Sequence, residues 1–125
     1  MALSHATSGE VVDVRPLGNA IGTGITHTIV KTNDLEVIRI VLLAGNDLPP
    51  HEVPGDITVQ CLEGKVTFGV GNLVRELTAG KFLYVEGGVK HSLLAREDST
   101  LLVTIVLKHK PSGDMNMSPV SDRPN

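Results

Sequence analysis

Aromatic residues are scarce in this sequence, which has no tryptophan, one tyrosine and two phenylalanines among 125 residues. A surface that stacks nucleic-acid bases needs aromatic side chains, so the composition disfavours one. An excess of basic residues is also lacking, because 11 Lys and Arg stand against 14 Asp and Glu, a formal net charge of −3. This charge leaves no electrostatic footprint for nucleic acid, and we expect no nucleic-acid partner.

Cysteine is represented by Cys61 alone. A single cysteine excludes an internal disulfide framework and suits a reducing compartment. No apolar run approaches the roughly 20 residues that a membrane-spanning helix needs, and the first ten residues lack the basic and then apolar pattern of a secretory signal. We therefore expect a cytoplasmic protein without a membrane partner.

Valine and isoleucine are plentiful, and Gly or Pro interrupts the apolar runs every several residues. This pattern predicts many short strands, and no window shows the apolar spacing of a helix. About eight to ten strands at this spacing indicate a sandwich or a barrel. The expected strands lie within residues 10–16, 25–30, 36–45, 56–64, 65–71, 72–80, 81–91, 92–96 and 101–109.

Two segments are expected to lie outside this strand pattern. Pro49 and Pro50 have no N–H to donate to a sheet, so residues 46–51 should be a loop that delivers His51 to the next strand. Residues 111–125 are rich in Pro, Ser, Asp and Asn, which predicts a flexible C-terminal tail. The remaining residues, 1–110, are long enough for one domain with its own core.

The stretch GNDLPPHEVPGDITVQCLEG, residues 45–64, resembles the first motif of the cupin family. That motif runs Gly, five residues, His, one residue, His, three or four residues, Glu, six residues, Gly. Gly45, His51 and Gly64 occupy the first Gly, the first His and the closing Gly. The second His position holds Val53 and the Glu position holds Ile57.

The stretch GKFLYVEGGVKH, which begins at Gly80, resembles the second cupin motif: Gly, five residues, Pro, one residue, Gly, two residues, His, three residues, Asn. Gly80, Gly88 and His91 match, whereas Glu86 and Ala95 replace the Pro and the Asn. Together the motifs resemble those of a small single-domain cupin of the RmlC-like type. The resemblance implies an all-β fold, an antiparallel jelly-roll β-barrel or double-stranded β-helix.

The resemblance also places a pocket inside the barrel and makes its metal site incomplete. Of the usual three His and one Glu, only His51 and His91 remain, so the metal-binding motif is degenerate. We expect these two histidines, Val53, Ile57 and Tyr84 to line a ligand pocket.

Two ligands are fewer than zinc or iron centres normally draw from a protein, and apolar replacements make the pocket drier. Glu52, Asp56 or Glu86 could complete the set. Two alternatives remain open: His51 and His91 bind a divalent Fe, Mn, Zn or Ni ion, or the site binds no metal.

Three other side chains could also have a functional role. His27 alternates with isoleucines and is interpreted as a cross-strand surface or core histidine. Cys61 shares the parity of buried strand positions and is interpreted as a small core residue. Arg39, in the middle of a strand, is predicted to be a solvated residue on the outer face; the alternative is an anion anchor that lines the cavity.

Three functions are compatible with these residues. The first is a cupin-type protein that binds a small molecule in the barrel; in it the histidines supply hydrogen bonds or a base that titrates near neutral pH. The second is a metal-dependent dioxygenase or isomerase with a reduced two-histidine ligand set. The third is a ligand-free dimeric scaffold. The resemblance implies a homodimer, whereas no catalytic residue, and hence no enzymatic activity, can be assigned from the sequence.

Overall fold

The computed structural model describes residues 4–108. In this range a short 3-10 helix, η1 (Gly18–Thr23), precedes nine strands. The strands are β1 (His27–Lys31), β2 (Leu35–Leu42), β3 (Asp47–His51), β4 (Ile57–Glu63), β5 (Lys65–Val70), β6 (Leu73–Thr78), β7 (Phe82–Val85), β8 (His91–Ala95) and β9 (Ser99–Val106). The predicted C-terminal tail, residues 111–125, lies outside the described residues.

No helix within residues 4–108 is both long enough and apolar enough to cross a membrane.

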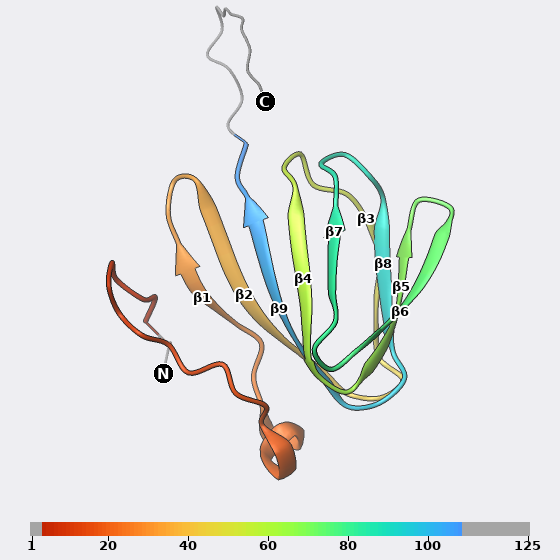
Figure 1. The fold of residues 1–125 in the computed structure, drawn as a ribbon, viewed down its shortest axis with the longest axis horizontal. Helices are drawn as coiled ribbons and strands as arrows, with labels where there is room; N and C mark the ends of the chain where they lie inside the picture. Colours follow the sequence, from red (N-terminus) through yellow and green to blue (C-terminus); the bar gives the residue numbers. More distant parts are fainter. Residues whose placement is uncertain (1–3, 109–125) are drawn as a thin grey trace, which may run out of the picture.

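The strands form two sheets with the core between them (Figure 1). The five-stranded sheet has the order β1-β2-β9-β4-β7, and the four-stranded sheet has the order β3-β8-β5-β6. Every pairing is antiparallel. The chain crosses from one sheet to the other several times, for example between β2 and β3 and between β3 and β4. This is the antiparallel jelly roll that the sequence predicts.

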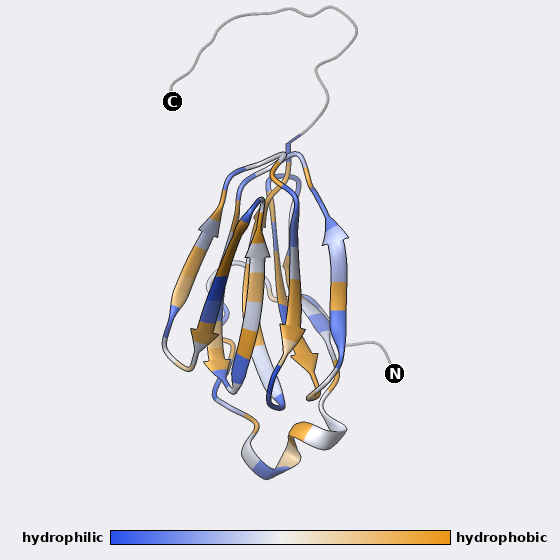
Figure 2. Cartoon of the chain, turned by 90° about the vertical axis from the view of Figure 1, so that its right-hand side faces the viewer, coloured by the Kyte–Doolittle hydropathy of each residue, from blue (hydrophilic) through white to orange (hydrophobic). Residues whose placement is uncertain are grey.

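Alternation along the strands builds the core. Val59 and Cys61 on β4, and Val66 and Phe68 on β5, are each at most 1% exposed, whereas Gln60 between the first two is exposed. Orange and blue bands accordingly alternate along many strands in Figure 2. Successive side chains of a strand point to opposite faces, so one face of each sheet is buried and the other is not. The prediction of a buried, unreactive position for Cys61 agrees with this geometry.

The segment around Pro49 and Pro50 differs from its predicted loop structure, because it contains the strand β3. This strand lies at the edge of the four-stranded sheet and pairs with β8 alone. Its register shifts between Leu48 and His51, which is where the two prolines lie. An edge strand tolerates proline at such an irregularity, since fewer N–H groups are needed there.

The predicted strand at residues 10–16 is also wrong, because this segment has no regular secondary structure. It belongs to a stretch that we call the N-terminal arm, residues 4–17, which runs beside β1 and leads into η1 (Figure 1). The Ala6 N–H donates to the Ile29 carbonyl at 2.7 Å. Few other backbone hydrogen bonds hold the arm, so side chains of the sheet must fix it.

Glu63, at the end of β4, fixes the last residues of the arm. Its carboxylate accepts hydrogen bonds from the N–H groups of Leu17 at 2.8 Å and Gly18 at 3.1 Å, and from the Thr100 hydroxyl at 2.9 Å. Burial raises the pKa of Glu63, but these hydrogen bonds outweigh burial and leave the pKa below its usual range. The charged form of Glu63 is therefore the one that the fold stabilises.

Glu63→Gln should lower the free energy of unfolding by about 1–2 kcal/mol at neutral pH, because it replaces a charged acceptor with a neutral one. Since the folded-state pKa is depressed, this contribution is present above the ordinary glutamate pKa and is lost as the pH falls below about 4. Urea unfolding at several pH values checks this. The matched control is Glu76→Gln, whose exposed side chain only approaches Lys65 at 3.8 Å. Parallel pH profiles for both variants would contradict the role of Glu63.

Arg39 is the second side chain that holds the arm, and its prediction needs correction. It faces outward as expected, since its neighbours Ile38 and Ile40 line the cavity between the sheets. It is nevertheless only 5% exposed. Its Nη2 donates to the carbonyl of Arg15 in the arm. The arm covers this part of the outer face, which strand alternation alone does not predict.

Candidate functional site

A cavity of about 130 Å³ lies between the two sheets. Its wall is almost wholly apolar, and its polar side chains are two histidines. The lining residues are Ile38, Ile40, Leu48, His51, Val53, Ile57, Val59, Phe68, His91, Leu93, Val103 and Ile105. A small apolar chamber with a few convergent polar groups is the usual form of a small-molecule site.

The two histidines come from neighbouring strands. His51 ends β3, His91 begins β8, and the two residues are paired in the antiparallel register. Their ring centroids are 4.3 Å apart and the ring planes are inclined by 59°. His91 is only 6% exposed, whereas His51 is exposed. One imidazole is therefore buried at the cavity and the other lies at its mouth.

Each imidazole is held by the backbone in the same way. Nδ1 of His51 lies 3.1 Å from the carbonyl oxygen of Pro49, and Nδ1 of His91 lies 3.0 Å from that of Val89. A carbonyl oxygen can only accept a hydrogen bond, so Nδ1 carries the proton in both rings. Nε2 is then the basic atom of each neutral ring, free to accept a hydrogen bond or to bind a metal.

The structure brings together four of the five predicted pocket residues. His51, His91, Val53 and Ile57 all line the cavity. These residues do not all come from one strand. His51 ends β3 and Ile57 begins β4 in the other sheet, so no single strand carries both residues. The chain reaches the same cavity from two sheets.

Tyr84 is the exception, and its assignment to the pocket is wrong. It lies on β7 opposite Thr58 of β4, and it is 55% exposed. Its neighbour Val85 is 2% exposed and belongs to the core. Alternation therefore directs the Tyr84 side chain to the outer face of the five-stranded sheet.

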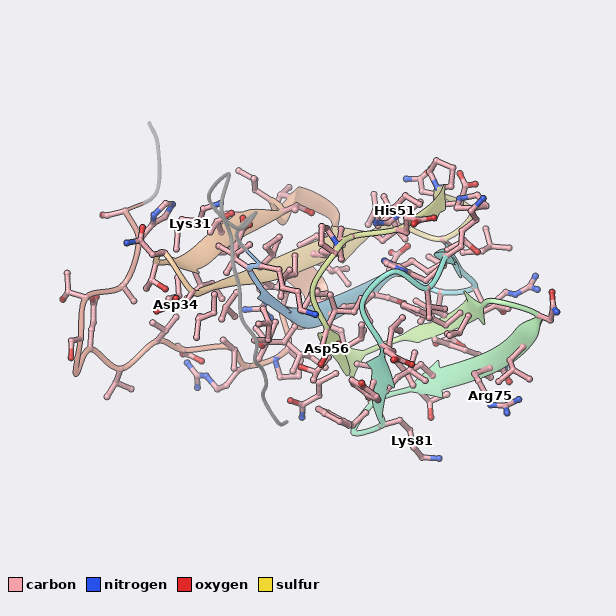
Figure 3. The ribbon with its side chains drawn as sticks, turned by 90° about the horizontal axis from the view of Figure 1, so that it is seen from above. Lys31, Asp34, His51, Asp56, Arg75 and Lys81 are labelled. Atoms are coloured by element: carbon pink, nitrogen blue, oxygen red, sulfur yellow. The ribbon has the colours of Figure 1, made fainter. Side chains whose placement is uncertain are left out.

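The carboxylates considered as replacement ligands do not line the cavity. Glu52 and Glu86 are exposed, and Asp56 Oδ1 accepts a hydrogen bond from the Gly87 N–H at 2.8 Å. Figure 3 shows Asp56 well apart from His51 in the view from above. Among residues 4–108, no group of three or more His, Cys, Asp or Glu side chains could share a metal ion.

The donor set consequently does not fit the metal centre that the cupin motifs imply. Two Nε2 atoms are available, and the rest of the wall is hydrocarbon. Protein sites for zinc or iron normally supply at least three ligands.

Comparisons with known proteins show which solved structures have a similar fold. No family model matches the chain, and no curated protein matches it. Among solved structures, a cupin superfamily protein from Desulfitobacterium hafniense superposes with a TM-score of 0.69 at 15% identity, over 82% of this chain and 100% of that one. An RmlC-like cupin from Shewanella frigidimarina has a TM-score of 0.64 at 19% identity, over 83% and 91% of the two chains. The fold is that of a cupin domain.

A third solved structure, that of a conserved protein of unknown function from Streptococcus pyogenes, is similar over 88% of this chain and 97% of that one. The TM-score is 0.68 and the identity 19%. Identities this low establish the shared fold and leave the activity of this chain to be argued from its own residues.

Most of the residues in the apolar wall of the cavity were not predicted from the sequence. Phe68 and Leu93 face each other on β5 and β8, and Ile38 and Ile40 approach from β2. Each belongs to an alternating run, so its burial could be read from the sequence. Its place beside the histidines depends on the register between strands, which alternation does not fix.

Proposed function

We propose that this cupin domain binds a small, neutral and largely apolar molecule that carries one hydrogen-bond donor, and that the histidine pair accepts this donor. The observation that carries the proposal is an apolar cavity. Among residues 4–108, its only polar side chains are His51 and His91, and Nδ1 of each is engaged by a backbone carbonyl. No catalytic residue is assigned, since binding alone is argued.

The volume of the cavity limits the size of the ligand. An engineered cavity of about 150 Å³ lined by Leu, Ile and Phe binds benzene. The cavity between the sheets is of similar size, about 130 Å³, and has a similar wall. A single six-membered ring with one small substituent is therefore near the upper limit.

The chemistry of the wall limits the charge of the ligand. In the part of the chain that the structure describes, no Lys or Arg side chain lines the cavity to pair with an anion, and no Asp or Glu lines it to pair with a cation. Burying an unpaired charge there would be costly. A neutral donor such as a hydroxyl or a ring N–H instead meets Nε2, an acceptor in the neutral imidazole. Phenol satisfies both limits and is a suitable probe.

Phenol should bind the full-length protein about five- to tenfold more tightly than benzene, since one neutral hydrogen bond is worth about 1 kcal/mol. Calorimetric titration, with NMR signals of the histidine rings as a second readout, measures both. Val53→Phe, which puts a ring into the mouth of the cavity, should weaken phenol binding at least about tenfold. Val74→Phe makes the same change at a 65% exposed site on β6 and should leave binding unaltered.

Two results of this experiment would overturn the proposal. One is that Val53→Phe and Val74→Phe change the affinity for phenol by the same amount. The other comes from a parallel titration with zinc. Near-stoichiometric zinc that a His51→Ala, His91→Ala double variant no longer binds would favour the alternative, a metal-dependent enzyme with two histidine ligands.

We also propose that the chain forms a homodimer through the outer face of the five-stranded sheet. Phe82 and Tyr84 on the edge strand β7 are 63% and 55% exposed, and Val106 on β9 is 48% exposed. Exposed aromatic residues beside an unpaired strand edge support an interface there. Tyr84→Ser should shift the protein from dimer to monomer in sedimentation velocity, whereas Leu73→Ser on β6 should not. A wild-type monomer at all concentrations would contradict this.

The expectation of a cytoplasmic protein stays a prediction. It is supported by the buried, free thiol of Cys61.

A further inference from the structure

We propose a second binding site, outside the barrel, at which Arg39 on the outer face of β2 binds a small oxyanion beneath the N-terminal arm. The site is separate from the cavity between the sheets, because Arg39 points away from it. Anion binding at Arg39 can therefore be confirmed or refuted independently of phenol binding by the histidine pair.

The first step is the environment of Arg39. The residue is paired with His27 on β1 and with Leu102 on β9, so it lies in the interior of the sheet and not at an edge. It is 5% exposed, and the only hydrogen bond of its guanidinium within residues 4–108 is donated by Nη2 to the Arg15 carbonyl. A guanidinium has five N–H donors and is charged at every physiological pH.

The second step is the unsatisfied donor. Nε of Arg39 is buried and has no hydrogen-bond partner among the described residues. An unpaired buried donor of a charged group is costly, and buried charges in proteins are generally paired. An unsatisfied group of this kind in a native structure calls for a partner such as an ion or a water molecule.

The third step is that nearby carboxylates are already engaged. Glu63 lies close enough to influence Arg39 electrostatically, but its oxygens accept from Leu17, Gly18 and Thr100. Asp13 accepts from Nε of Arg15 and forms an ion pair with it at 2.8 Å. Within residues 4–108 no Asp or Glu forms an ion pair with Arg39.

The fourth step is the space next to Arg39. A pocket of about 470 Å³, lined by Asp13, Arg15, Pro16, Leu17 and Arg39, opens to solvent between the arm and the sheet. It is large enough for an anion together with a small organic group. The Asp13–Arg15 pair is exposed, and such pairs are worth little, so Arg15 can turn to a ligand at small cost.

These features favour a carboxylate or a phosphate. Both present oxygens that accept charge-assisted hydrogen bonds from a guanidinium, which is the residue best suited to such groups. The burial of Arg39 strengthens the attraction, since water screens it less than it would an exposed arginine. A cationic ligand is disfavoured because two arginines line the pocket against one carboxylate, that of Asp13, which is already paired with Arg15.

The test is a titration of the full-length protein with sodium phosphate and, separately, with sodium acetate, at an ionic strength held constant with sodium chloride. The readout is the NMR resonance of the Arg39 Nε–H group. We expect a saturable shift of this resonance with at least one of the two anions, together with a rise in melting temperature. Saturation with phosphate alone, acetate alone or both supports the site and identifies the type of oxyanion.

Arg39→Lys keeps the charge but removes Nε and the planar guanidinium, and should weaken anion binding at least about tenfold. The matched control is Arg75→Lys on β6, where the wild-type guanidinium is exposed and donates to the Val74 carbonyl. This variant should bind the anion as the wild type does. If Arg39→Lys does not fold, the wild-type Nε–H resonance decides alone. A resonance that neither anion moves, or equal binding by both variants, overturns the proposal.

Discussion

Gly64→Ala is expected to destabilise the protein by about 3 kcal/mol or more, because two separate costs fall on one position. Gly64 joins β4 to β5 with φ of 90°, a backbone conformation that side chains strongly disfavour. An alanine Cβ would also overlap the Ser99 hydroxyl and the Asp98 carbonyl. The Ser99 hydroxyl is fixed by hydrogen bonds, because its Oγ accepts from the Lys65 N–H at 3.0 Å and donates to the Glu97 carbonyl at 2.7 Å.

Gly80→Ala separates these two costs. Gly80 has nearly the same φ, 86°, but among residues 4–108 a Cβ at this position would have no atom within 4 Å apart from its chain neighbours. Its replacement should therefore cost about 1 kcal/mol from backbone strain alone. Urea unfolding of both variants beside the wild type measures the difference. Equal losses at the two positions would show that the contact with the β8–β9 turn does not constrain Gly64.

The turns were the part of the fold most open to prediction from the sequence. Glycine is the residue that tolerates positive φ, and the four glycines matched to the cupin motifs, Gly45, Gly64, Gly80 and Gly88, have φ between 83° and 90°. The strands between them alternate in polarity, which indicates their buried faces. Alternation and turn positions predicted a sandwich or a barrel, and the resemblance to the cupin motifs narrowed this to the jelly roll.

The errors share a different cause, which is dependence on elements far apart in the chain. Arg39 looks like a solvated outer-face residue until the N-terminal arm, more than twenty residues earlier, covers it. Pro49 and Pro50 exclude a central strand, but β3 proves to be an edge strand because β8 pairs with one side of it only. The sequence of β7 does not by itself show whether Tyr84 points into the barrel or away from it. Only the pairing of β7 with β4 shows which of its residues face inward.

The candidate site could be predicted only in part, because some of its features depend on local sequence and others on elements far apart in the chain. The two histidines follow from motif spacing, which is local information, and their pairing across β3 and β8 agrees with it. The size and dryness of the cavity depend instead on how far the two sheets are held apart. Phe68 is the largest side chain of that wall, so its contribution can be isolated by truncation.

Phe68→Ala should reduce the free energy of unfolding by about 3–5 kcal/mol, the usual cost of removing a fully buried phenyl ring. Phe68 is 1% exposed, and its ring lies nearly parallel to that of His91, with 6.1 Å between centroids. Phe68→Leu retains most of the volume and should cost much less. Urea unfolding ranks the two variants, and a loss for alanine no greater than that for leucine would mean that the site collapses to fill the void.

The same truncation should enlarge the cavity, so that a ligand too large for the wild type fits. A ligand that binds only the folded state raises its stability according to the ligand concentration and affinity. We therefore expect 1-naphthol, which has a second fused ring, to raise the melting temperature of Phe68→Ala more than that of the wild type. Phenol should raise the melting temperatures of the two proteins by more similar amounts. This expectation rests on the proposed function, whereas the loss of stability does not. A normal loss of stability without the naphthol effect would count against ligand binding in the cavity and leave the packing role of Phe68 intact.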